Sequence, residues 1–300
     1  MTPELLVIGA GPCGVSAALW ARSLGLSVEV LEREEAAGGQ LRSVHFRPQN
    51  FAGSLEGDGP ALAARLARQL DEAGIEMRRG EAAALERAAA VVRTAAGERI
   101  EAAAVLIATG VRRRRLDVPG ERELEGRGVS YSATQDRTRF AGEDVVVVGG
   151  GDAAFENALL LAGVGCRVTL VVRGAVRARN DFRARVAAEP HIELLEQVRV
   201  AAIEGERSVG AVRIEGERGN FTLETAGVVV KIGVLPNTEW CRGAVELDPE
   251  GYVLVEGDLS TSHPHAWAAG DVTRPPLFGM AVAAGQGALA VASIRGVLRV

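Results

Sequence analysis

Three glycines near the start of the chain have the spacing that lets a backbone approach a diphosphate group. Gly9, Gly11 and Gly14 form a Gly-x-Gly-x-x-Gly sequence between an apolar run and a segment of helical character. In such a turn the first glycine bends the chain, the second leaves room for pyrophosphate, and the third lets helix and strand pack closely. Glu32 ends the next apolar run, where a carboxylate can accept hydrogen bonds from an adenosine ribose. The spacing therefore predicts a dinucleotide site, with a plain structural turn as the alternative.

A second turn of the same kind lies about 140 residues further along the chain. Gly149, Gly151 and Ala154 follow a run of valines and open another helical segment. The strand after this helix ends in Arg173, with Arg177 nearby, where a site for NAD would carry a carboxylate. An arginine at this point suits the 2′-phosphate of NADP. A solvated basic loop is the alternative.

Composition narrows the classes of function. The formal net charge is −5, and the sequence has no acidic or basic tail, so the charge pattern does not indicate a basic surface for binding nucleic acid. No apolar run reaches the ~18 residues of a membrane span, so we expect no membrane segment. The 4 histidines form no cluster with carboxylates or cysteines, which predicts no metal site. The 3 cysteines, at positions 13, 166 and 241, form no CxxC pair, and their use fits a reducing cytoplasm.

Each glycine turn needs a strand before it and a helix and second strand after it, and the sequence supplies such a βαβ unit at both positions. Between them we expect a helix over residues 60–73, a pair of strands within 76–103 and a buried strand ending near 108–110. The segment 112–121 is charged and contains a proline, which is typical of a crossover between domains. We therefore predict the α/β class, with two Rossmann-like, three-layer dinucleotide-binding domains.

We expect the second domain to be inserted into the first. A chain of 300 residues exceeds one typical domain, yet residues 241–300 hold too few elements to fold alone. We therefore assign residues 1–113 and 241–300 to a first, discontinuous domain and residues 114–240 to a second, inserted domain.

The motifs taken together resemble those of the low-molecular-weight thioredoxin reductase family, a class II group of the FAD- and NAD(P)-binding pyridine nucleotide-disulfide oxidoreductases. The resemblance covers nearly the whole chain in order. It implies a first domain that binds FAD, a second domain that binds NADPH or NADH, and a homodimer. Besides the two glycine turns, the segments that carry it are GGQL at 38–41, Asn50, ATG at 108–110, VPGE at 118–121, GVSYSATQD at 128–136, VLPNT at 234–238 and AAGDV at 268–272.

The resemblance implies a role for specific positions around the flavin. Gly39, Gln40 and Asn50 would line the flavin, and Asp271 would hold the ribitol chain. The start of the last helix, Met280–Val282, would face the pyrimidine edge, because the partial positive charge of a helix N-terminus stabilises an anionic reduced flavin. Simple core packing of this helix is the alternative. The remaining FAD-binding residues implied are Gly9, Gly11, Pro12, Cys13, Gly14, Glu32, Arg33, Leu41, Ala82, Ala108, Thr109, Gly110, Gly270 and Ala281. The NAD(P)-binding residues implied are Gly149, Gly151, Asp152, Ala153, Ala154, Arg173, Arg177, Ile232 and Gly233.

The sequence departs from the family at the position of its redox-active disulfide. The family carries CATC ahead of an acid, and this chain reads Ser-Ala-Thr-Gln at 132–135, followed by Asp136. Serine and glutamine cannot accept two electrons as a disulfide does, so reduction of thioredoxin through an internal CxxC is chemically unavailable. Asp136 resembles the acid that protonates the departing thiolate in the family. A surface or hydrogen-bonded acid is the alternative.

Two further departures concern positive charge. The family's phosphate clamp is one residue short, since only Arg173 and Arg177 match it, and this leaves the choice between NADPH and NADH open. The Arg-Gln pair before the last helix is replaced by Gly279 and Met280, which removes a guanidinium near the flavin. The backbone amides at that point could still serve.

Cys13 offers a route to disulfide chemistry. The sequence GPCG at 11–14 resembles that of the bacillithiol disulfide reductases, where a cysteine at this position is considered catalytic. A helix N-terminus lowers the pKa of a thiol, but a bound pyrophosphate would place negative charge on the same amides and favour the neutral thiol. A nucleophilic Cys13 and a buried packing Cys13 are both open, whereas Cys166 and Cys241 are expected to be structural.

The run Arg112–Arg115 could dock an acidic redox protein such as a ferredoxin or flavodoxin, because clustered charge orients an encounter. A solvated charge run is the alternative.

The leading hypothesis is an FAD-dependent NAD(P)H oxidoreductase. Hydride would pass from nicotinamide C4 to flavin N5, and electrons would leave the reduced flavin for an external acceptor, either a small molecule or a small acidic redox protein. Glu156, early in the second dinucleotide helix, is the candidate for positioning the nicotinamide. The alternatives are a small-disulfide reductase that uses Cys13, a ferredoxin- or flavodoxin-linked reductase, and a flavin redox sensor without catalytic turnover.

Overall fold

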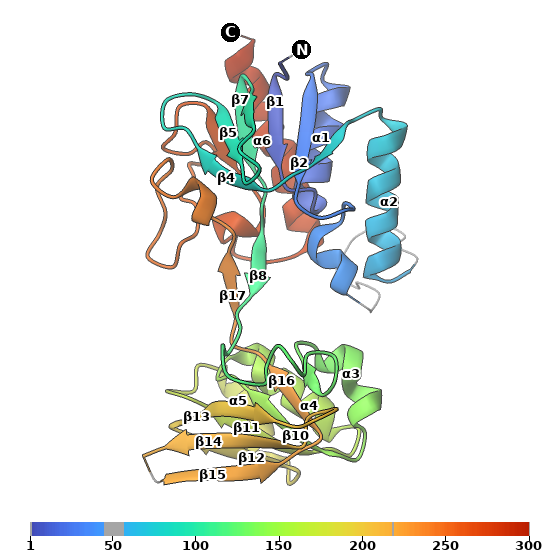
Figure 1. The fold of residues 1–300 in the computed structure, drawn as a ribbon, viewed down its shortest axis with the longest axis vertical. Coiled ribbons are helices and arrows are strands. Elements are labelled where there is room, and N and C mark those ends of the chain that lie inside the picture. Colours follow the sequence, from blue (N-terminus) through green and yellow to red (C-terminus); the bar gives the residue numbers. More distant parts are fainter. Residues whose placement is uncertain (1, 45–56, 218, 300) are drawn as a thin grey trace. The chain divides into compact units, whose positions relative to one another are not determined.

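The computed structural model describes residues 2–44, 57–217 and 219–299, and the chain divides into two compact units. Unit 1 comprises Met1–Arg112 and Leu235–Val300, and unit 2 comprises Arg113–Val234. Figure 1 shows that each unit has a sheet and helices of its own. The first boundary lies one residue from the one expected, whereas the second lies at 234/235 and not at 240/241. The reason is that η2 (Glu239–Cys241) packs against β4 (Ala82–Leu85) of unit 1.

Unit 1 is built on a five-stranded sheet with the order β18-β7-β1-β2-β3. Its central strand, β1 (Leu5–Ile8), pairs in parallel with β2 (Val28–Glu32) and with β7 (Ala104–Ile107). Every residue of β1 is buried, as expected of a parallel strand that is covered on both faces. The edge strands are β3 (Met77–Arg79) and β18 (Ala266–Ala268).

Two layers cover this sheet because successive side chains of a strand point to opposite faces. Leu5 and Val7 pack with buried residues of α1 and α6, and Leu6 and Ile8 pack with those of an antiparallel sheet, β4-β5-β6. Unit 1 therefore has the three layers that the sequence predicts. The further elements of unit 1 are α1 (Pro12–Ser23), η1 (Gly39–Ser43), α2 (Gly59–Glu72), β5 (Val91–Thr94), β6 (Arg99–Glu101), η3 (Asp271–Thr273) and α6 (Met280–Leu298).

Unit 2 repeats the plan. Its five-stranded sheet has the order β12-β11-β10-β16-β9, with β10 (Asp144–Val148) between β11 (Arg167–Val172) and β16 (Gly227–Val230). Val145 and Val147 face a core shared with α4, whereas Val146 and Val148 face the antiparallel sheet β13-β14-β15. The remaining elements are β9 (Val129–Ser130), α3 (Ala133–Phe140), α4 (Asp152–Ala162), α5 (Asn180–Ala188), β12 (Ile192–Glu196), β13 (Val198–Glu204), β14 (Ala211–Gly216) and β15 (Gly219–Glu224).

The chain passes between the units twice. It leaves unit 1 through β8 (Val111–Arg113) and returns through β17 (Val234–Pro236), and these two strands pair with each other. The beginning of the expected crossover at 112–121 therefore lies in β8.

Helix α6 is, among the described residues, the one helix long and apolar enough to cross a membrane by length and composition. One face of it is buried in unit 1. A Cβ on Gly287 would lie 2.3 Å from the Cys13 carbonyl oxygen, so α6 and α1 are in close backbone contact. We interpret α6 as a packed helix of unit 1.

Replacing Gly227 by alanine should destabilise unit 2. The added Cβ would lie 2.3 Å from a ring carbon of Phe140, which is only 1% exposed. Overpacking of this kind costs about 1–3 kcal/mol. We therefore expect the free energy of opening of unit 2, measured by amide hydrogen exchange, to fall by about 2 kcal/mol. Gly174→Ala, where nothing lies within 4 Å of the new Cβ, is the matched control. Equal exchange in the two variants would contradict the packing described.

Candidate functional site

In the glycine turn of unit 1 the first and third glycines are closely packed, and the second is open. Gly9 has φ +103°, and a Cβ there would lie 2.6 Å from the Ala108 carbonyl oxygen. A Cβ on Gly14 would lie 1.8 Å from the Gly9 carbonyl oxygen, so only glycine allows this approach of α1 to the turn. Nothing lies within 4 Å of the Cβ position of Gly11. The turn has the closed and open positions that a bound pyrophosphate requires.

Helix α1 begins at Pro12, directly after this turn, and no side chain caps it. The first-turn amides of a helix lack partners within the helix, and proline at the first position has no N–H to leave unsatisfied. The amides after Pro12 can therefore bind an anion.

Glu32 ends β2 with its carboxylate fixed by two backbone amides. It accepts hydrogen bonds from the Ala10 amide at 2.6 Å and the Glu34 amide at 2.9 Å, and it is 7% exposed. A carboxylate oxygen has more than one lone-pair direction, so Glu32 can also accept from a ribose hydroxyl. The neighbouring Arg33 is exposed and pairs with Glu34 at 3.5 Å.

Ala82, one of the FAD-binding residues implied by the resemblance, starts β4 in the antiparallel layer. The chain reaches it just after Gly80, whose amide donates to the Glu32 carbonyl oxygen at 2.8 Å. The start of β4 and the end of β2 therefore lie at the same edge of unit 1.

The GGQL segment forms η1 and lies against the glycine turn. The Gly38 amide donates to the Ala10 carbonyl at 2.7 Å, and a Cβ on Gly39 would lie 3.1 Å from the Gly11 Cα. Leu41 packs in a small apolar cluster that includes Met280 at the start of α6. These contacts bring early and late segments of the chain together. Asn50, expected to line the flavin, lies outside the described residues.

Asp271 presents an unsatisfied acceptor in unit 1. Its Oδ1 is buried and has no hydrogen-bond partner among the residues that the structure describes. Burial raises the pKa of this carboxyl, and a hydrogen bond with Gln40 partly opposes the rise. The preceding Gly270 has φ +81°, donates its amide to the Gln286 side chain at 2.8 Å, and packs against Cys13. A buried oxygen without a donor fits a ligand hydroxyl, because unmade hydrogen bonds in a protein interior are costly.

The ATG and PNT motifs of unit 1 bond to each other. The Thr109 hydroxyl donates to the Asn237 carbonyl at 2.7 Å, and the Asn237 side-chain amide donates to the Thr109 carbonyl at 2.8 Å. The Asn237 backbone amide donates to the Gly110 carbonyl at 3.0 Å. Asn237 was not among the site residues inferred from the sequence, although its motif was noted, because its partner is distant along the chain.

Helix α6 begins at Met280, as expected, and has no side-chain cap. Ala281 is exposed and Val282 is partly exposed. The uncapped first turn leaves amides that can face a negatively charged group.

The glycine turn of unit 2 has the same construction. Gly149 has φ +146°, and a Cβ there would lie 2.1 Å from the Lys231 carbonyl oxygen. Nothing lies within 4 Å of the Cβ position of Gly151, and Ala154 is fully buried. Ala153 is exposed on the first turn of α4. This turn can also accept a pyrophosphate.

The basic loop after β11 is attached to this turn by its backbone. The amides of Arg177 and Ala178 both donate to the Gly150 carbonyl, at 2.7 and 3.0 Å. Arg179 forms an ion pair with Asp152 at 2.8 Å. Arg173 and Arg177 are exposed and have no ion pair among the described residues. They are the arginines available to a phosphate at this edge.

The segment that replaces the redox disulfide begins α3. The Ser130 hydroxyl donates to Asp136 at 2.5 Å, and Arg139 lies 3.9 Å from the same carboxylate. The Ala133 amide donates to Asn157 of α4 at 3.0 Å. Asp136 therefore has the contacts of a hydrogen-bonded structural acid. Glu156, next to Asn157, is exposed on α4.

Ile232 and Gly233 follow β16 at the carboxyl edge of the sheet of unit 2. Gly233 has φ +92°, and its carbonyl accepts from the Arg114 amide at 3.0 Å. The residue before them is Lys231, the only lysine of the chain, to which the sequence alone assigns no function.

All three cysteines are buried free thiols. Burial, with a smaller effect of Asp271, raises the pKa of Cys13 far above its ordinary value. Burial raises the pKa of Cys241 to about 12, and Cys166 donates to the Phe140 carbonyl at 2.9 Å. These surroundings favour a packing role for Cys13.

The arginine run is partly engaged within each unit. Arg112 pairs with Glu239 at 2.6 Å, and Arg115 pairs with Glu125 at 2.8 Å. Charges already paired contribute less to the attraction of an acidic protein.

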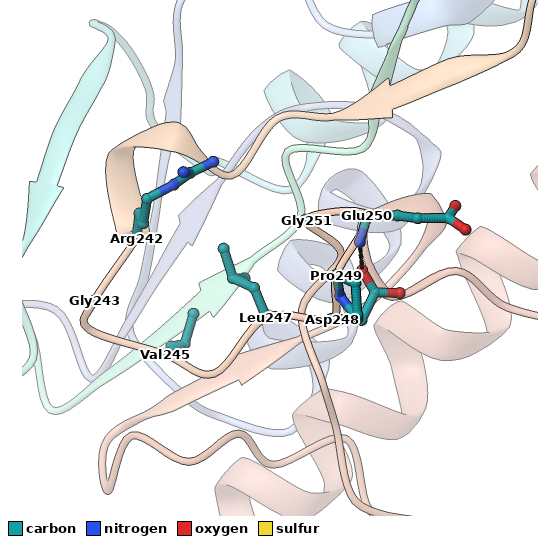
Figure 2. Close-up of a pocket in the computed structure, with 8 residues that line it drawn as sticks. All are labelled: Arg242, Gly243, Val245, Leu247, Asp248, Pro249, Glu250 and Gly251. Carbon is teal, nitrogen blue, oxygen red and sulfur yellow. Dashed lines mark hydrogen bonds between the residues drawn. The ribbon is translucent and has the colours of Figure 1, made fainter.

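A surface pocket of about 380 Å³ lies in unit 1, and Figure 2 shows the residues that line it. Arg242 and Glu250 lie at opposite ends of it. The pocket contains none of the residues expected to bind a dinucleotide, so we do not interpret it as part of that site. Its lining consists of Arg242, Gly243, Val245, Leu247, Asp248, Pro249, Glu250 and Gly251.

Comparison with known proteins identifies relatives along nearly the whole chain. The pyridine nucleotide-disulphide oxidoreductase model matches residues 3–288. A component protein of the alkyl hydroperoxide reductase of Pseudomonas putida is 37% identical over 298 residues, covering 96% of this chain and 56% of that protein. NADH dehydrogenase of Bacillus subtilis strain 168 is 33% identical, covering 96% of this chain and 57% of that protein. The chain thus spans little more than half the length of these two relatives.

A solved structure confirms the fold class and the resemblance to thioredoxin reductases. Lactococcus lactis thioredoxin reductase in its FR conformation superposes with a TM-score of 0.79 at 27% identity, covering 98% of each chain.

The thiol of Cys13 should resist alkylation in the folded protein. Because it is buried and its pKa is raised, we expect iodoacetamide to modify it at least about 100-fold more slowly than free cysteine at pH 8. Peptide mass spectrometry measures the rate, with denatured protein as the control. Labelling of folded Cys13 at the rate of a free thiol would favour the nucleophilic alternative.

Proposed function

The chain belongs to the pyridine nucleotide-disulphide oxidoreductase family, and on that premise we propose that it is an FAD-dependent NAD(P)H oxidoreductase that passes electrons from reduced flavin to an external acceptor. The observation that carries this proposal is the buried, unpartnered Asp271 Oδ1 in the same unit as an open, uncapped glycine turn. Hydroxyl and diphosphate are the groups that the ribitol and pyrophosphate of FAD would present to them.

The residues of unit 1 fit FAD along its length. Glu32 would accept from the adenosine ribose, the amides after Pro12 would bind the pyrophosphate, and Asp271 would accept from the ribitol. The uncapped first turn at Met280 would stabilise negative charge on the ring system. Bound FAD would supply the chemistry of hydride acceptance and of onward electron transfer.

The residues of unit 2 fit NAD(P)H in the same way. The turn at Gly149–Gly151 would bind its pyrophosphate, and Arg173 with Arg177 would face the adenosine end. Glu156 would orient the nicotinamide end, because it projects from α4, the helix that starts at this turn.

The route of electrons out of the protein is proposed from the chemistry of the side chains. Residues 132–135 carry no sulfur, and the three thiols are buried in separate places. An external acceptor that reacts with the flavin itself is therefore favoured. The name of the Bacillus subtilis relative, NADH dehydrogenase, supports the same class of reaction, since it specifies the electron donor and no disulfide.

The other hypotheses have less support. A disulfide reductase that uses Cys13 needs a thiolate, which burial disfavours. Docking of a ferredoxin or flavodoxin on the arginine run is weakened by the ion pairs of Arg112 and Arg115. The redox sensor, the homodimer and the cytoplasmic location stay predictions.

The function is tested by mixing the FAD-loaded protein anaerobically with NADH and with NADPH. We expect at least one dinucleotide to bleach the flavin absorbance. Reoxidation is then followed with ferredoxin, flavodoxin, quinones, small disulfides and oxygen to identify the acceptor. Flavin that stays oxidised with both dinucleotides would refute the proposed oxidoreductase activity and favour the hypothesis of a flavin redox sensor.

Replacing Arg173 and Arg177 together by glutamine should weaken NADPH binding by about 10- to 100-fold, because charge-assisted hydrogen bonds contribute about 1.5–3 kcal/mol. NADH, which lacks the 2′-phosphate, should be affected by less than about threefold. Dissociation constants from equilibrium titration provide the measurement. The control is Arg183→Gln, which removes an exposed positive charge from α5. Equal weakening for both dinucleotides would contradict the assignment.

A further inference from the structure

Lys231 is a chemical exception in this sequence. It is the only lysine of a chain whose other long-chain cations are all arginines. It directly follows β16, and its amide donates to the Val148 carbonyl at 2.8 Å. The backbone of Lys231 is therefore fixed beside the glycine turn of unit 2.

The repeated plan of the two units identifies what Lys231 replaces. In unit 1 the Ala108 carbonyl packs against Gly9, and in unit 2 the Lys231 carbonyl packs against Gly149. Each of these residues follows the strand on the same side of the central strand, β7 in unit 1 and β16 in unit 2. Lys231 thus carries a long cationic side chain at the position where unit 1 has a methyl group.

The strand order places Lys231 away from the adenosine end. In a sheet ordered β12-β11-β10-β16-β9, a dinucleotide lies across the carboxyl edge where the order reverses, between β10 and β16. Arg173 follows β11 on one side of that point, and Lys231 follows β16 on the other. Since the basic loop faces the adenosine end, Lys231 lies on the nicotinamide side.

Charges from two elements act on the Lys231 amine. Glu156 of α4 attracts it, and Arg113 at the end of β8 repels it. Arg113 is itself held at 5.8 Å over the ring of Tyr131. Burial, followed by Arg113, lowers the pKa of Lys231 from 10.5 to about 8, and Glu156 opposes this change.

We propose that Lys231 is a positioning residue for the nicotinamide end of bound NAD(P)H, acting through Glu156, and that its protonation makes nucleotide binding depend on pH. This rests on the proposed function of unit 2. The protonated amine attracts the Glu156 carboxylate toward the carboxyl edge of the sheet, and its charge also favours the anionic nucleotide. Arginine could not provide this response, because its guanidinium does not lose a proton in proteins.

The direction of the pH effect follows from the protonation states. Well below pH 8 the amine is charged in both the free and the bound protein, so affinity is constant. A bound anion raises the pKa of the amine, and nucleotide binding above pH 8 therefore takes up a proton. Affinity should fall as pH rises through about 8, by up to about tenfold per unit until the pKa of the complex is reached.

The first test observes the amine itself. Protein made with ¹³Cε-labelled lysine gives a single lysine signal, because the chain contains one lysine. We expect this signal to titrate near pH 8, to titrate lower still in Glu156→Gln, and to shift when NAD(P)H is added. A midpoint near 10.5 would overturn the proposal, as would a signal unaffected by bound nucleotide.

The second test measures the dissociation constant of the more tightly bound dinucleotide between pH 6.5 and 9.5. Lys231→Arg should keep the affinity at pH 7 within about threefold and remove the pH dependence, whereas Lys231→Gln should bind about tenfold more weakly at pH 7. Flavin reduction at saturating nucleotide should slow by about tenfold in Lys231→Gln and recover in Lys231→Arg. Arg199→Gln removes one exposed positive charge from β13 and is the control, with no expected effect.

The outcomes separate the two proposals. Wild-type protein that binds neither dinucleotide at any pH would refute the function of unit 2, and the inference with it. Wild-type protein that binds a dinucleotide with constant affinity across this range would refute the role of Lys231 alone.

Discussion

Both units depend on one close backbone contact at the carboxyl edge of a parallel sheet. In each, a carbonyl that follows the neighbouring strand occupies the space where the first turn glycine would carry a Cβ: Ala108 against Gly9, and Lys231 against Gly149. The contact requires glycine in both turns and aligns the strand end with the start of the helix. The next glycines, Gly11 and Gly151, are open at their Cβ positions and, as N-cap residues without a side chain, leave the first amides of the helix uncapped. A diphosphate can then be bound by backbone alone, which leaves the side chains around it free to determine what the rest of the ligand does.

Those side chains differ between the two units, and each set suits a different kind of ligand. Unit 1 presents Glu32, a buried carboxylate held by backbone amides, and the buried Oδ1 atom of Asp271, and both can accept from hydroxyl groups. Unit 2 presents the exposed Arg173 and Arg177 after β11, and after β16 it presents Lys231, whose charge is influenced by Glu156. The first set suits a prosthetic group that stays bound. The second suits a charged dinucleotide that binds and leaves.

The sequence was sufficient for features that depend on local spacing. The two glycine turns, the three-layer plan and the start of α6 at Met280 follow from motifs within short stretches of chain. It was insufficient where a partner lies far away. The two amides that hold Glu32, the unpartnered Asp271 oxygen and the bonds between Thr109 and Asn237 exist only once the sheet has formed. The second domain boundary was placed too late for the same reason, because the segment after Val234 packs with elements of unit 1.

The central claim is that electrons enter this protein and leave it through the flavin, with no internal disulfide as an intermediate store. Anaerobic titration of the FAD-loaded protein with NAD(P)H measures this directly, as the amount of dinucleotide needed to complete the loss of flavin absorbance. One flavin accepts two electrons, so the account predicts an end point at about one dinucleotide per flavin. An end point near two would show a second two-electron acceptor in the chain and would contradict the account.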